Sequence, residues 1–585
     1  MRVIDGGSGY RSQNGYDAHF GVPVPSATYN VSVTWPGHHH GVSNWTTHPG
    51  LGSIVPSSLS VSEALLVVRP EAVVVSVGFV SPWGYGSVDR DPLVGDSVTI
   101  PIVVSPSTNT LDLRVSATVN DVDVSSSWGW DESLKSYTVT YSTPSEDRLW
   151  PWTGLSISVR VVDGGGVVSS VSGRVVPGTT FSESSTSLGM SGFGHSADRG
   201  VCFGDVDGDG WVDMFVARDG VGNQLWMNGG DGTSFTESAA EWGVGGVGAG
   251  DHSQGCGFAD IDGDGDVDLF VSMYGDTNQL YVNNGTGFTE EGSARGVADA
   301  GVSQAAVWGD VDGDGDVDLF VCQDGTANFL HMNGGSGMFV NEAGGRRVDT
   351  SLASHQAVMF DVDGDGWLDI AVVNAGNANE LFVNNGAGVF TESGSSLGWT
   401  DTGEGQGVSV ADMTGDGVLD AYVANYGFRD LLYIGDGGGV GVFSEEGVAR
   451  GVGAFTGDST GVSSLDVGHD GDLDVVVGVQ SGLGLLWVND GVGVFRESAS
   501  ALGLVADTGR TLAVPVVDLD GDGDLDMVFG DSGFVYVSHD AHPSVRNWIK
   551  VRPLTVGGAQ SAFGATVRVV CVDGCGEDSA GWTGV

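Results

Sequence analysis

A repeat of about 52 residues governs how this chain can fold. The motif D-x-D-G-D-G-x-x-D, or a close variant of it, occurs seven times, at intervals of 55, 50, 51, 51, 54 and 52 residues. A second motif, F-x-E or a close variant, begins at residues 181, 235, 288, 339, 390, 443 and 495. Two motifs with one period indicate a propeller or a solenoid, in which neighbouring repeats bury a shared core.

Each repeat has the pattern of four short β-strands. In the third repeat, apolar runs at 305–309, 318–321, 329–332 and 339–340 are separated by the Asp motif and by a hairpin signal at Asn333-Gly334. Glycine supplies 99 of the 585 residues, which disfavours a helical solenoid because glycine destabilises helix interiors. The sequence therefore predicts an all-β fold with a seven-bladed β-propeller over residues 179–541.

At each end of the repeat array, one of the two motifs, the Asp motif or F-x-E, occurs without the other. No F-x-E follows the last repeat after Phe534–Val537, whereas an extra F-x-E, Phe181-Ser182-Glu183, precedes the first repeat. We expect residues 181–183 to supply the outer strand of the last blade, which would close the ring and remove its open sheet edges.

The Asp motif has the composition of a calcium-binding loop. It places carboxylates at loop positions 1, 3, 5 and 9, and Ca²⁺ prefers six to eight oxygen ligands from carboxylates, carbonyls and water. Glycine at positions 4 and 6 lets the loop wrap an ion, and the carbonyl of position 7 is the expected backbone ligand. Mg²⁺ is less suited to such a flexible oxygen cage made by the protein alone. The loop is not an EF-hand, since the bidentate Glu expected at position 12 is missing and a strand follows. Asp-Gly pairs also form simple turns, but seven at one fixed phase favour calcium.

The loops are not equivalent, and we expect about five strong Ca²⁺ sites and two weaker ones. In two loops position 3 has lost its carboxylate, to Thr414 in one and to Gly468 in the other. The predicted ligands of the five complete loops are Asp205, Asp207, Asp209 and Asp213; Asp260, Asp262, Asp264 and Asp268; Asp310, Asp312, Asp314 and Asp318; Asp361, Asp363, Asp365 and Asp369; and Asp518, Asp520, Asp522 and Asp526. Those of the weaker loops are Asp412, Thr414, Asp416 and Asp420, and Asp466, Asp470 and Asp474.

These motifs resemble FG-GAP/VCBS repeats, as found in integrin α-chain propellers and in many secreted proteins. The resemblance extends over residues 181–541. It implies a seven-bladed propeller with Ca²⁺ in the loop between the first two strands of a blade.

The flanking segments are similar to a second module. Asn547-Trp548-Ile549-Lys550-Val551 and Phe563-Gly564-Ala565-Thr566 look like the opening of an ASPIC/UnbV domain, which follows such propellers in the cartilage acidic protein family. Gly6–Tyr10 and His19-Phe20-Gly21 look like its closing half. We therefore expect partial ASPIC/UnbV-like segments at 1–69 and 542–585, unless the two segments pair with each other within this chain.

Residues 70–178 show a third pattern. β-rich runs at 72–80, 97–104, 111–118, 136–142, 155–162 and 167–171 alternate with turn residues, which predicts an Ig-like β-sandwich. The five cysteines are too few for a disulfide-built scaffold. Cys202, Cys256 and Cys322 are expected to be small buried residues, whereas Cys571 and Cys575 form either a local disulfide or two free thiols.

Charge and composition exclude several partners. The chain has 22 Lys and Arg against 76 Asp and Glu, a net charge of −54, so nucleic acid and anionic lipid are excluded as direct partners unless cations bridge the contact. No apolar stretch is long enough for a membrane span, and no signal peptide opens the chain. Because calcium is scarce in the cytosol and both ends look like cuts, we expect a fragment of an extracellular or cell-surface protein.

We therefore interpret the chain as a non-enzymatic, extracellular, calcium-binding propeller that serves adhesion or recognition of a protein or glycan ligand. No nucleophile motif was found. The alternative is a carbohydrate-binding lectin or a polysaccharide-active propeller, such as a lyase. Exposed Trp would favour the lectin, and clustered Tyr, His and Arg would favour the lyase.

Overall fold

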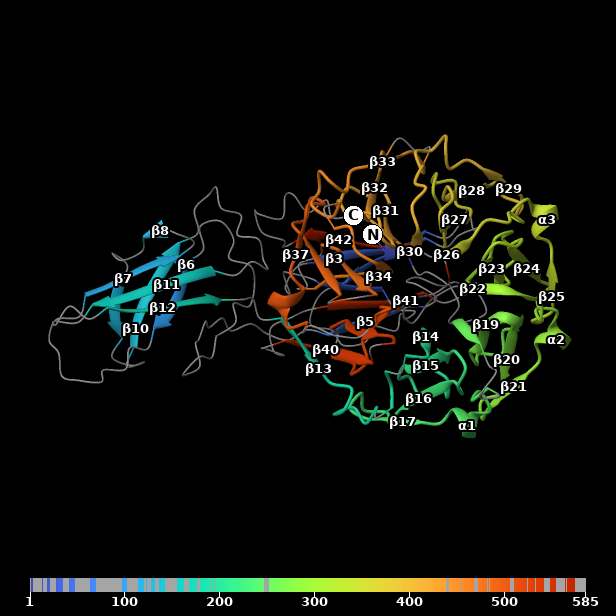
Figure 1. The fold of residues 1–585 in the computed structure, drawn as a ribbon, viewed down its shortest axis with the longest axis horizontal. Helices are drawn as coiled ribbons and strands as arrows, with labels where there is room; N and C mark the ends of the chain where they lie inside the picture. Colours follow the sequence, from blue (N-terminus) through green and yellow to red (C-terminus); the bar gives the residue numbers. More distant parts are fainter. Residues whose placement is uncertain are drawn as a thin grey trace.

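The computed structural model describes residues 179–540, apart from 191, 195, 247–251, 438–440, 454, 468–471, 481, 483, 505–509, 523 and 532 (Figure 1). Beyond this range it describes Gln13, Phe563 and the backbone of strands β1–β12, β41 and β42. Among all these residues no helix is long and apolar enough to cross a bilayer.

The repeats form a ring of antiparallel strand groups, and within each group the first strand lies nearest the centre (Figure 1). Apolar residues of the first three strands are buried, since both faces of each group pack against neighbours. The strands of repeats one to three are β14 (Asp198–Gly204), β15 (Asp213–Arg218), β16 (Gln224–Asn228), β17 (Phe235–Glu237), β18 (Ser253–Ala259), β19 (Asp268–Thr277), β20 (Gln279–Asn283), β21 (Phe288–Glu290), β22 (Ala300–Gly309), β23 (Asp318–Gln323), β24 (Phe329–Asn333) and β25 (Phe339–Asn341).

The remaining repeats follow the same order around the ring. Their strands are β26 (Ser354–Phe360), β27 (Asp369–Asn374), β28 (Glu380–Asn384), β29 (Phe390–Glu392), β30 (Gly405–Ala411), β31 (Asp420–Asn425), β32 (Leu431–Gly435), β33 (Phe443–Glu445), β34 (Ser459–Leu465), β35 (Asp474–Val479), β36 (Leu485–Asn489), β37 (Phe495–Glu497), β38 (Val516–Val517), β39 (Asp526–Phe529) and β40 (Phe534–Asp540). One-turn helices follow the fourth strands: α1 (Ala239–Trp242), α2 (Gly292–Arg295), α3 (Ala343–Arg346) and a 3₁₀ turn at Ala499–Leu502.

The predicted seven-bladed propeller is wrong, because the seven repeats do not form seven separate sheets. β19 is ten residues long, and its end pairs with the start of β22, so repeats two and three share one eight-stranded sheet. Repeat five continues through β1 (Arg2–Val3) into a sheet with strands from both termini. Among the described strands, the sheets built from repeat strands alone number five, and by this count the propeller has five blades.

The strand that closes the ring is β13 (Thr179–Glu183), as the extra F-x-E predicts. It pairs antiparallel with β40, with Phe181 opposite Ser538 and Glu183 opposite Tyr536. The Phe181 side chain is buried in a cluster with Leu502 and Tyr536, which joins the last two repeats. A further apolar cluster joins the last repeat to the first, so the core continues across the closure.

The two terminal segments pair with each other, which is the alternative that the sequence analysis left open for residues 1–69 and 542–585. β41 (Trp548–Pro553) lies between β2 (Ala18–Gly21) and β5 (Ala64–Arg69). β42 (Thr566–Asp573) pairs with β1 and with β3 (Thr28–Thr34), which in turn pairs with β4 (Val42–Thr47). Strand pairing of this kind is long-range and leaves no local signal in the sequence.

The terminal segments also contact the inner strands of the ring. Gln13 is fully buried, and its backbone N–H donates to the Val201 carbonyl at 3.1 Å. Its side-chain amide accepts from the Phe258 N–H at 2.7 Å and donates to the Phe258 carbonyl at 3.0 Å. Phe563 packs into the apolar cluster of the first three repeats.

Residues 70–178 contribute two antiparallel sheets, with the orders β6-β10-β9 and β12-β11-β7-β8. Their strands are β6 (Ser97–Ile102), β7 (Arg114–Val119), β8 (Val122–Asp123), β9 (Trp128–Asp131), β10 (Ser136–Ser142), β11 (Leu155–Val162) and β12 (Val168–Val175). The run at 72–80 lies outside the described residues. The Ig-like sandwich stays a prediction, because the side chains of these seven strands lie outside the described residues.

Cys202 and Cys256 are buried, as expected, but the sequence analysis did not predict that they pair. Cys202 on β14 and Cys256 on β18 form a disulfide, with their Cα atoms 6.0 Å apart. It connects the inner strands of the first two repeats. Cys322 is free and buried, as expected, and the side chains of Cys571 and Cys575 lie outside the described residues.

Ring closure by β13 predicts that Phe181→Ala will destabilise the whole propeller. Large-to-small substitution of a buried Phe lowers the free energy of unfolding by about 3–5 kcal/mol. The control is Val340→Ala on β25, where the side chain is 62% exposed. Urea denaturation of the full chain, followed by Trp fluorescence, measures both variants. Equal midpoints for the two variants would mean that β13 is not part of the cooperative ring.

Candidate metal centres

The Asp loops lie where the sequence predicts, between the first and second strands of their repeats. In the third repeat, β22 ends at Gly309, the loop begins at Asp310, and its ninth residue, Asp318, begins β23. The turn requires left-handed backbone angles at positions 4 and 6, where Gly313 has φ +74° and Gly315 has φ +96°. Glycine adopts these angles without steric cost.

Five loops bring three carboxylates together. In each, one carboxylate oxygen from every member lies within 4.8 Å of the others. These are the five loops that the sequence analysis identifies as complete. The groups are Asp205, Asp207 and Asp213; Asp260, Asp262 and Asp268; Asp310, Asp312 and Asp318; Asp361, Asp363 and Asp365; and Asp518, Asp520 and Asp526.

The fourth predicted ligand of each complete loop lies outside its group. In four loops this is position 5, namely Asp209, Asp264, Asp314 and Asp522. Its Oδ1 accepts the backbone N–H of position 7, as in the bond from Asp316 to Asp314 at 3.0 Å. In the fourth repeat the outlier is Asp369 at position 9, and Asp365 joins the group instead. The structure therefore supports three clustered carboxylates per loop rather than four.

The two loops with an altered position 3 form no such group among the described residues. In the fifth repeat, Thr414 stands between Asp412 and Asp416, and its hydroxyl oxygen is buried without a hydrogen-bond partner. A threonine oxygen is a neutral ligand, so this loop offers one negative charge fewer. In the sixth repeat Asp466 and Asp474 are described, whereas Gly468 and Asp470 lie outside the described residues.

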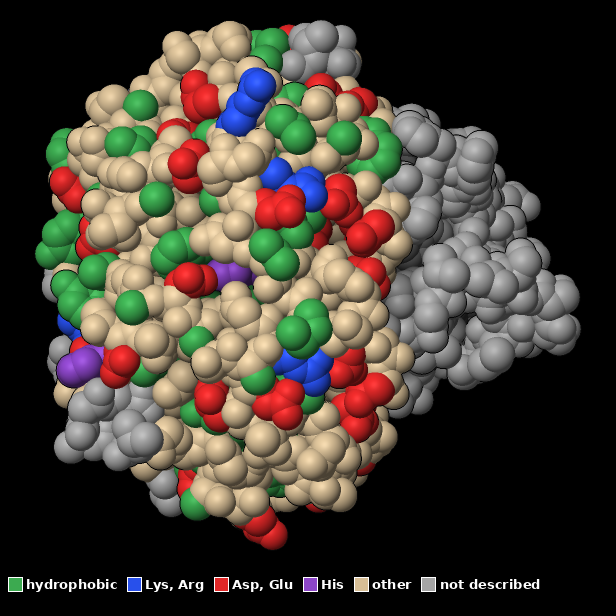
Figure 2. All heavy atoms as spheres, turned by 90° about the vertical axis from the view of Figure 1, so that its right-hand side faces the viewer, with side chains coloured by type: hydrophobic (Ala, Val, Ile, Leu, Met, Phe, Trp, Pro, Cys, Tyr) green, Lys and Arg blue, Asp and Glu red, His purple; other side chains and the backbone are tan. Residues whose placement is uncertain are grey.

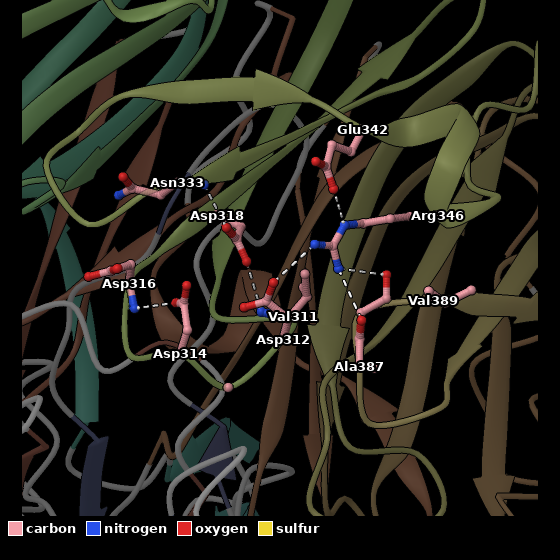
Figure 3. A network of polar contacts seen from close by, with 12 residues as sticks. Val311, Asp312, Asp314, Asp316, Asp318, Asn333, Glu342, Arg346, Ala387 and Val389 are labelled. Atoms are coloured by element: carbon pink, nitrogen blue, oxygen red, sulfur yellow. Dashed lines mark hydrogen bonds and ion pairs between the residues drawn. The ribbon is translucent and has the colours of Figure 1, made fainter.

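The aspartate at position 9 has a structural role that the sequence analysis missed. Asp318 accepts two backbone N–H groups, from Val311 in its loop at 3.1 Å and from Asn333 at the end of β24 at 2.8 Å (Figure 3). The same pair of bonds occurs in all seven repeats, at Asp213, Asp268, Asp318, Asp369, Asp420, Asp474 and Asp526. This side chain holds the loop against the third strand.

Burial makes the charged form of this aspartate costly. Burial raises the pKa of Asp318 to about 8, although its two backbone N–H donors oppose the shift. The pKa of Asp213, Asp268 and Asp369 is likewise raised to about 8. Desolvation penalises a buried carboxylate unless positive charge lies close to it. A cation at the three-carboxylate group would supply that charge.

The donor set fits a hard cation such as Ca²⁺. Every member of the five groups is a carboxylate, and hard divalent cations prefer oxygen ligands. In two of the groups, Oδ1 of Asp262 and Oδ1 of Asp312 are buried and accept no hydrogen bond. A buried anionic oxygen that accepts no hydrogen bond is stabilised by a nearby cation. These two oxygens therefore fit a bound metal ion. No histidine or cysteine joins a group among the described residues, so softer metals are disfavoured.

Figure 2 shows how the acidic side chains are distributed on the rim near β25, α2 and α3. They gather on one half of this face, and basic side chains lie among them. By their contacts, Arg295 of α2 and Arg346 of α3 pair with the loop residues Asp262 and Asp312.

A second feature missed from the sequence is an asparagine that links neighbouring repeats. The Asn333 side chain donates to the Val317 carbonyl of its own loop at 3.2 Å and to the Ile261 carbonyl of the preceding loop at 2.9 Å. Asn228 donates in the same way to Leu519 at 3.3 Å, which connects the first repeat to the last. The sequence does carry a signal for this link, an asparagine fifteen residues after loop position 9. It occurs at Asn228, Asn283, Asn333, Asn384 and Asn489.

The glutamate of F-x-E also has a local role. Oε1 of Glu290 accepts the N–H of Gly292 at 2.8 Å and so caps the first turn of α2. The equivalent bond forms at Glu183, Glu237, Glu392, Glu445 and Glu497, and Asn341 replaces the glutamate in the third repeat. The motif thus marks the end of a fourth strand because it starts the turn that follows.

Comparison with known proteins identifies the repeats. The model of the FG-GAP-like repeat family matches residues 205–271, 260–321, 361–423 and 466–529, so the chain contains FG-GAP-like repeats in a β-propeller. Neither the ASPIC/UnbV type nor a specific likeness to integrin α-chains is confirmed. No curated protein matches the chain by sequence.

Similar solved structures are distant. BBS1N in complex with ARL6DN is 12% identical, with a TM-score of 0.39, over 60% of this chain and 95% of that one. Sqt1 of Saccharomyces cerevisiae is 9% identical, with a TM-score of 0.34, over 66% and 93%. The fucose-specific lectin from Aleuria aurantia is 14% identical, with a TM-score of 0.32, over 54% and 98%. Likenesses this distant indicate no function.

The dual role of position 9 predicts that Asp318→Ala destabilises the protein even without metal. Two buried backbone N–H groups lose their acceptor, at about 1–3 kcal/mol each. Asp314→Ala is the control, because Asp314 is exposed and water can replace it. Thermal denaturation in EDTA measures both variants. If Asp318→Ala lost stability only when calcium was present, position 9 would be a metal ligand and nothing more.

Proposed function

We propose that this chain is an extracellular calcium-binding propeller that recognises a protein or glycan ligand, with Ca²⁺ in a structural role. The observation that carries the proposal is the coincidence of five three-carboxylate groups with the five complete loops. Turn-forming Asp-Gly pairs alone do not require their side chains to converge on one point. The residues that would hold the ions are those of the five groups, and a bound ion would offset their mutual repulsion.

The amount of stabilisation follows from mass action. An extracellular-type site with a Kd of about 0.1 mM, in free calcium of about 1–2 mM, contributes roughly 1.4–1.8 kcal/mol to the folded state. Five divalent ions would also remove ten negative charges from a chain with a net charge of −54. Both effects favour the folded ring where calcium is abundant.

An extracellular location is supported by the disulfide between Cys202 and Cys256. Disulfides persist in oxidising compartments and are rare in the cytosol. The concentration of calcium outside cells is also sufficient to fill sites of the affinity proposed here.

Recognition is assigned to the face opposite the Asp loops. The turns between second and third strands lie at the other ends of the sheets, and there the fifth repeat exposes Tyr426 and Phe428. Tyr274, near the end of β19, is 49% exposed. Aromatic side chains give a binding surface large contact area at low entropic cost, so these residues are candidates for ligand contact.

The same aromatic side chains support carbohydrate recognition as the alternative. In the described part of the chain, the exposed large hydrophobic residues include Tyr and Phe but no Trp. Because exposed Trp would favour a lectin, this composition makes the alternative weaker than the main proposal. A glycan array probed with and without calcium distinguishes the alternatives. Glycan binding that requires Tyr426 and Phe428 would favour the lectin, and an array without signal would favour a protein ligand.

Calcium titration tests the metal part of the proposal. Isothermal calorimetry on the full chain after chelation should show uptake of about five Ca²⁺ ions, with weaker binding beyond these. Mg²⁺ at the same concentration should bind poorly, because it demands strict octahedral geometry. The melting temperature should rise when calcium is added and should return to its calcium-free value when EDTA is added. No heat of binding and no change in melting temperature would overturn the proposal.

A further inference from the structure

An arginine reaches two of the five carboxylate groups. Arg346, the last residue of α3, places Nη2 3.0 Å from Oδ2 of Asp312, at loop position 3 of its own repeat (Figure 3). Arg295, the last residue of α2, does the same in the preceding repeat, where its Nη2 lies 3.4 Å from Oδ2 of Asp262. The side chains of both arginines are largely buried, at 14% and 16% exposure, so solvent screens these ion pairs only in part.

Each arginine is held in place by further contacts. Nε of Arg346 pairs with Glu342 one turn earlier at 3.0 Å. Its Nη1 donates to the carbonyls of Ala387 and Gly388, at 3.2 and 3.0 Å, in the hairpin of the next repeat. Arg295 repeats this pattern with Glu291 at 2.9 Å and with one hairpin carbonyl at 2.7 Å. The guanidinium thus connects a loop, a helix turn and the neighbouring repeat.

The two oxygens of the carboxylate at position 3 have different surroundings. Oδ2 of Asp312 faces the arginine, whereas Oδ1 is buried and accepts no hydrogen bond. Asp312 is also a member of the three-carboxylate group with Asp310 and Asp318. The arginine therefore fixes the orientation of a predicted ligand and cancels one negative charge of the group.

The other three groups have no such arginine. The arginine stands seven residues after the Phe of F-x-E, and the equivalent residues next to those groups are Trp242, Leu397 and Leu188. A third arginine, Arg450, has the same position in the fifth repeat, with the same pairing to Glu446 and the same hairpin carbonyls. There position 3 is Thr414, so Arg450 faces no carboxylate at that loop position.

We propose that Arg295 and Arg346 act as resident cations that compete with calcium, so that the loops of the second and third repeats bind Ca²⁺ more weakly than the other three complete loops. The inference rests on the proposed function. A fixed positive charge repels an incoming cation and lowers the negative charge of the site, and loop affinity depends on that charge. When calcium is scarce, the arginines keep these two loops and their junctions with the next repeats in place.

The test compares Arg346→Leu with Arg450→Leu in the full chain. Both variants lose the contacts to the glutamate one turn earlier and to the hairpin, but only the first releases a carboxylate of the Asp loop, that of Asp312. Wild-type calcium isotherms should resolve three tighter and two weaker sites. Arg346→Leu should move one weak site toward the tight class, by about tenfold, while Arg450→Leu leaves the isotherm unchanged. Leu397→Arg in the fourth repeat should weaken one tight site.

A second measurement examines the ion pair without calcium. In EDTA, Arg346→Leu and Asp312→Asn should each lower the melting temperature, and their combination should lower it by less than the sum of the two. Calcium should restore more of the stability of Arg346→Leu than of Arg450→Leu. These results would support the inference.

Two outcomes would overturn it separately. If the wild-type chain bound no calcium, the proposed function and the competition would both be wrong, although the melting data would still report the ion pair. If calcium bound normally but Arg346→Leu left the isotherm unchanged or weakened it, the arginine would be a structural brace and the inference alone would be wrong.

Discussion

The buried aspartate at loop position 9 is the interaction on which the rest of the ring depends. Its two oxygens accept one N–H from the Asp loop and one from the end of the third strand, in every repeat. Because the loop is held in this way, the carboxylates of positions 1 and 3 are brought beside it. The same loop presents the backbone carbonyl to which an asparagine of the next repeat binds. One side chain therefore links local loop geometry to the contact between repeats.

The cost of this arrangement explains why a cation is expected. Three carboxylates within 4.8 Å repel one another, and burial raises the pKa of the innermost one to about 8. The structure shows one source of compensating charge, and a bound cation would be a second. In the second and third repeats an arginine lies against position 3. In the first, fourth and last repeats no arginine has that position, so under the proposed function these groups would depend more on a bound ion.

The sequence predicted the local features well. The fixed phase of the Asp motif placed every loop between the right strands, and the extra F-x-E at Phe181 identified the closing strand. All five loops with a complete motif contain a group of three carboxylates. These features depend on residues close together in the chain, where type and spacing determine the turn and the strand.

Long-range features escaped prediction for a physical reason. The merging of repeats two and three depends on where β19 ends. Pairing of the termini joins strands more than 500 residues apart, so the sequence could name it as an alternative but could not decide it. Cys202 and Cys256 occupy neighbouring inner strands, a signal that becomes visible only once the repeats are aligned on their loops. Position 5 was assigned as a ligand because the motif contains it, yet in the third repeat Asp314 instead accepts the N–H of Asp316.

The central claim is that the five carboxylate groups are cation sites, and anomalous X-ray diffraction tests it most directly. Crystals of the full chain soaked in Tb³⁺, a trivalent substitute for Ca²⁺, should give anomalous peaks at the groups that contain Asp213, Asp268, Asp318, Asp363 and Asp526. The peaks in the second and third repeats should have the lower occupancy, because an arginine already lies there. Peaks elsewhere on the surface, with none at these groups, would contradict the account.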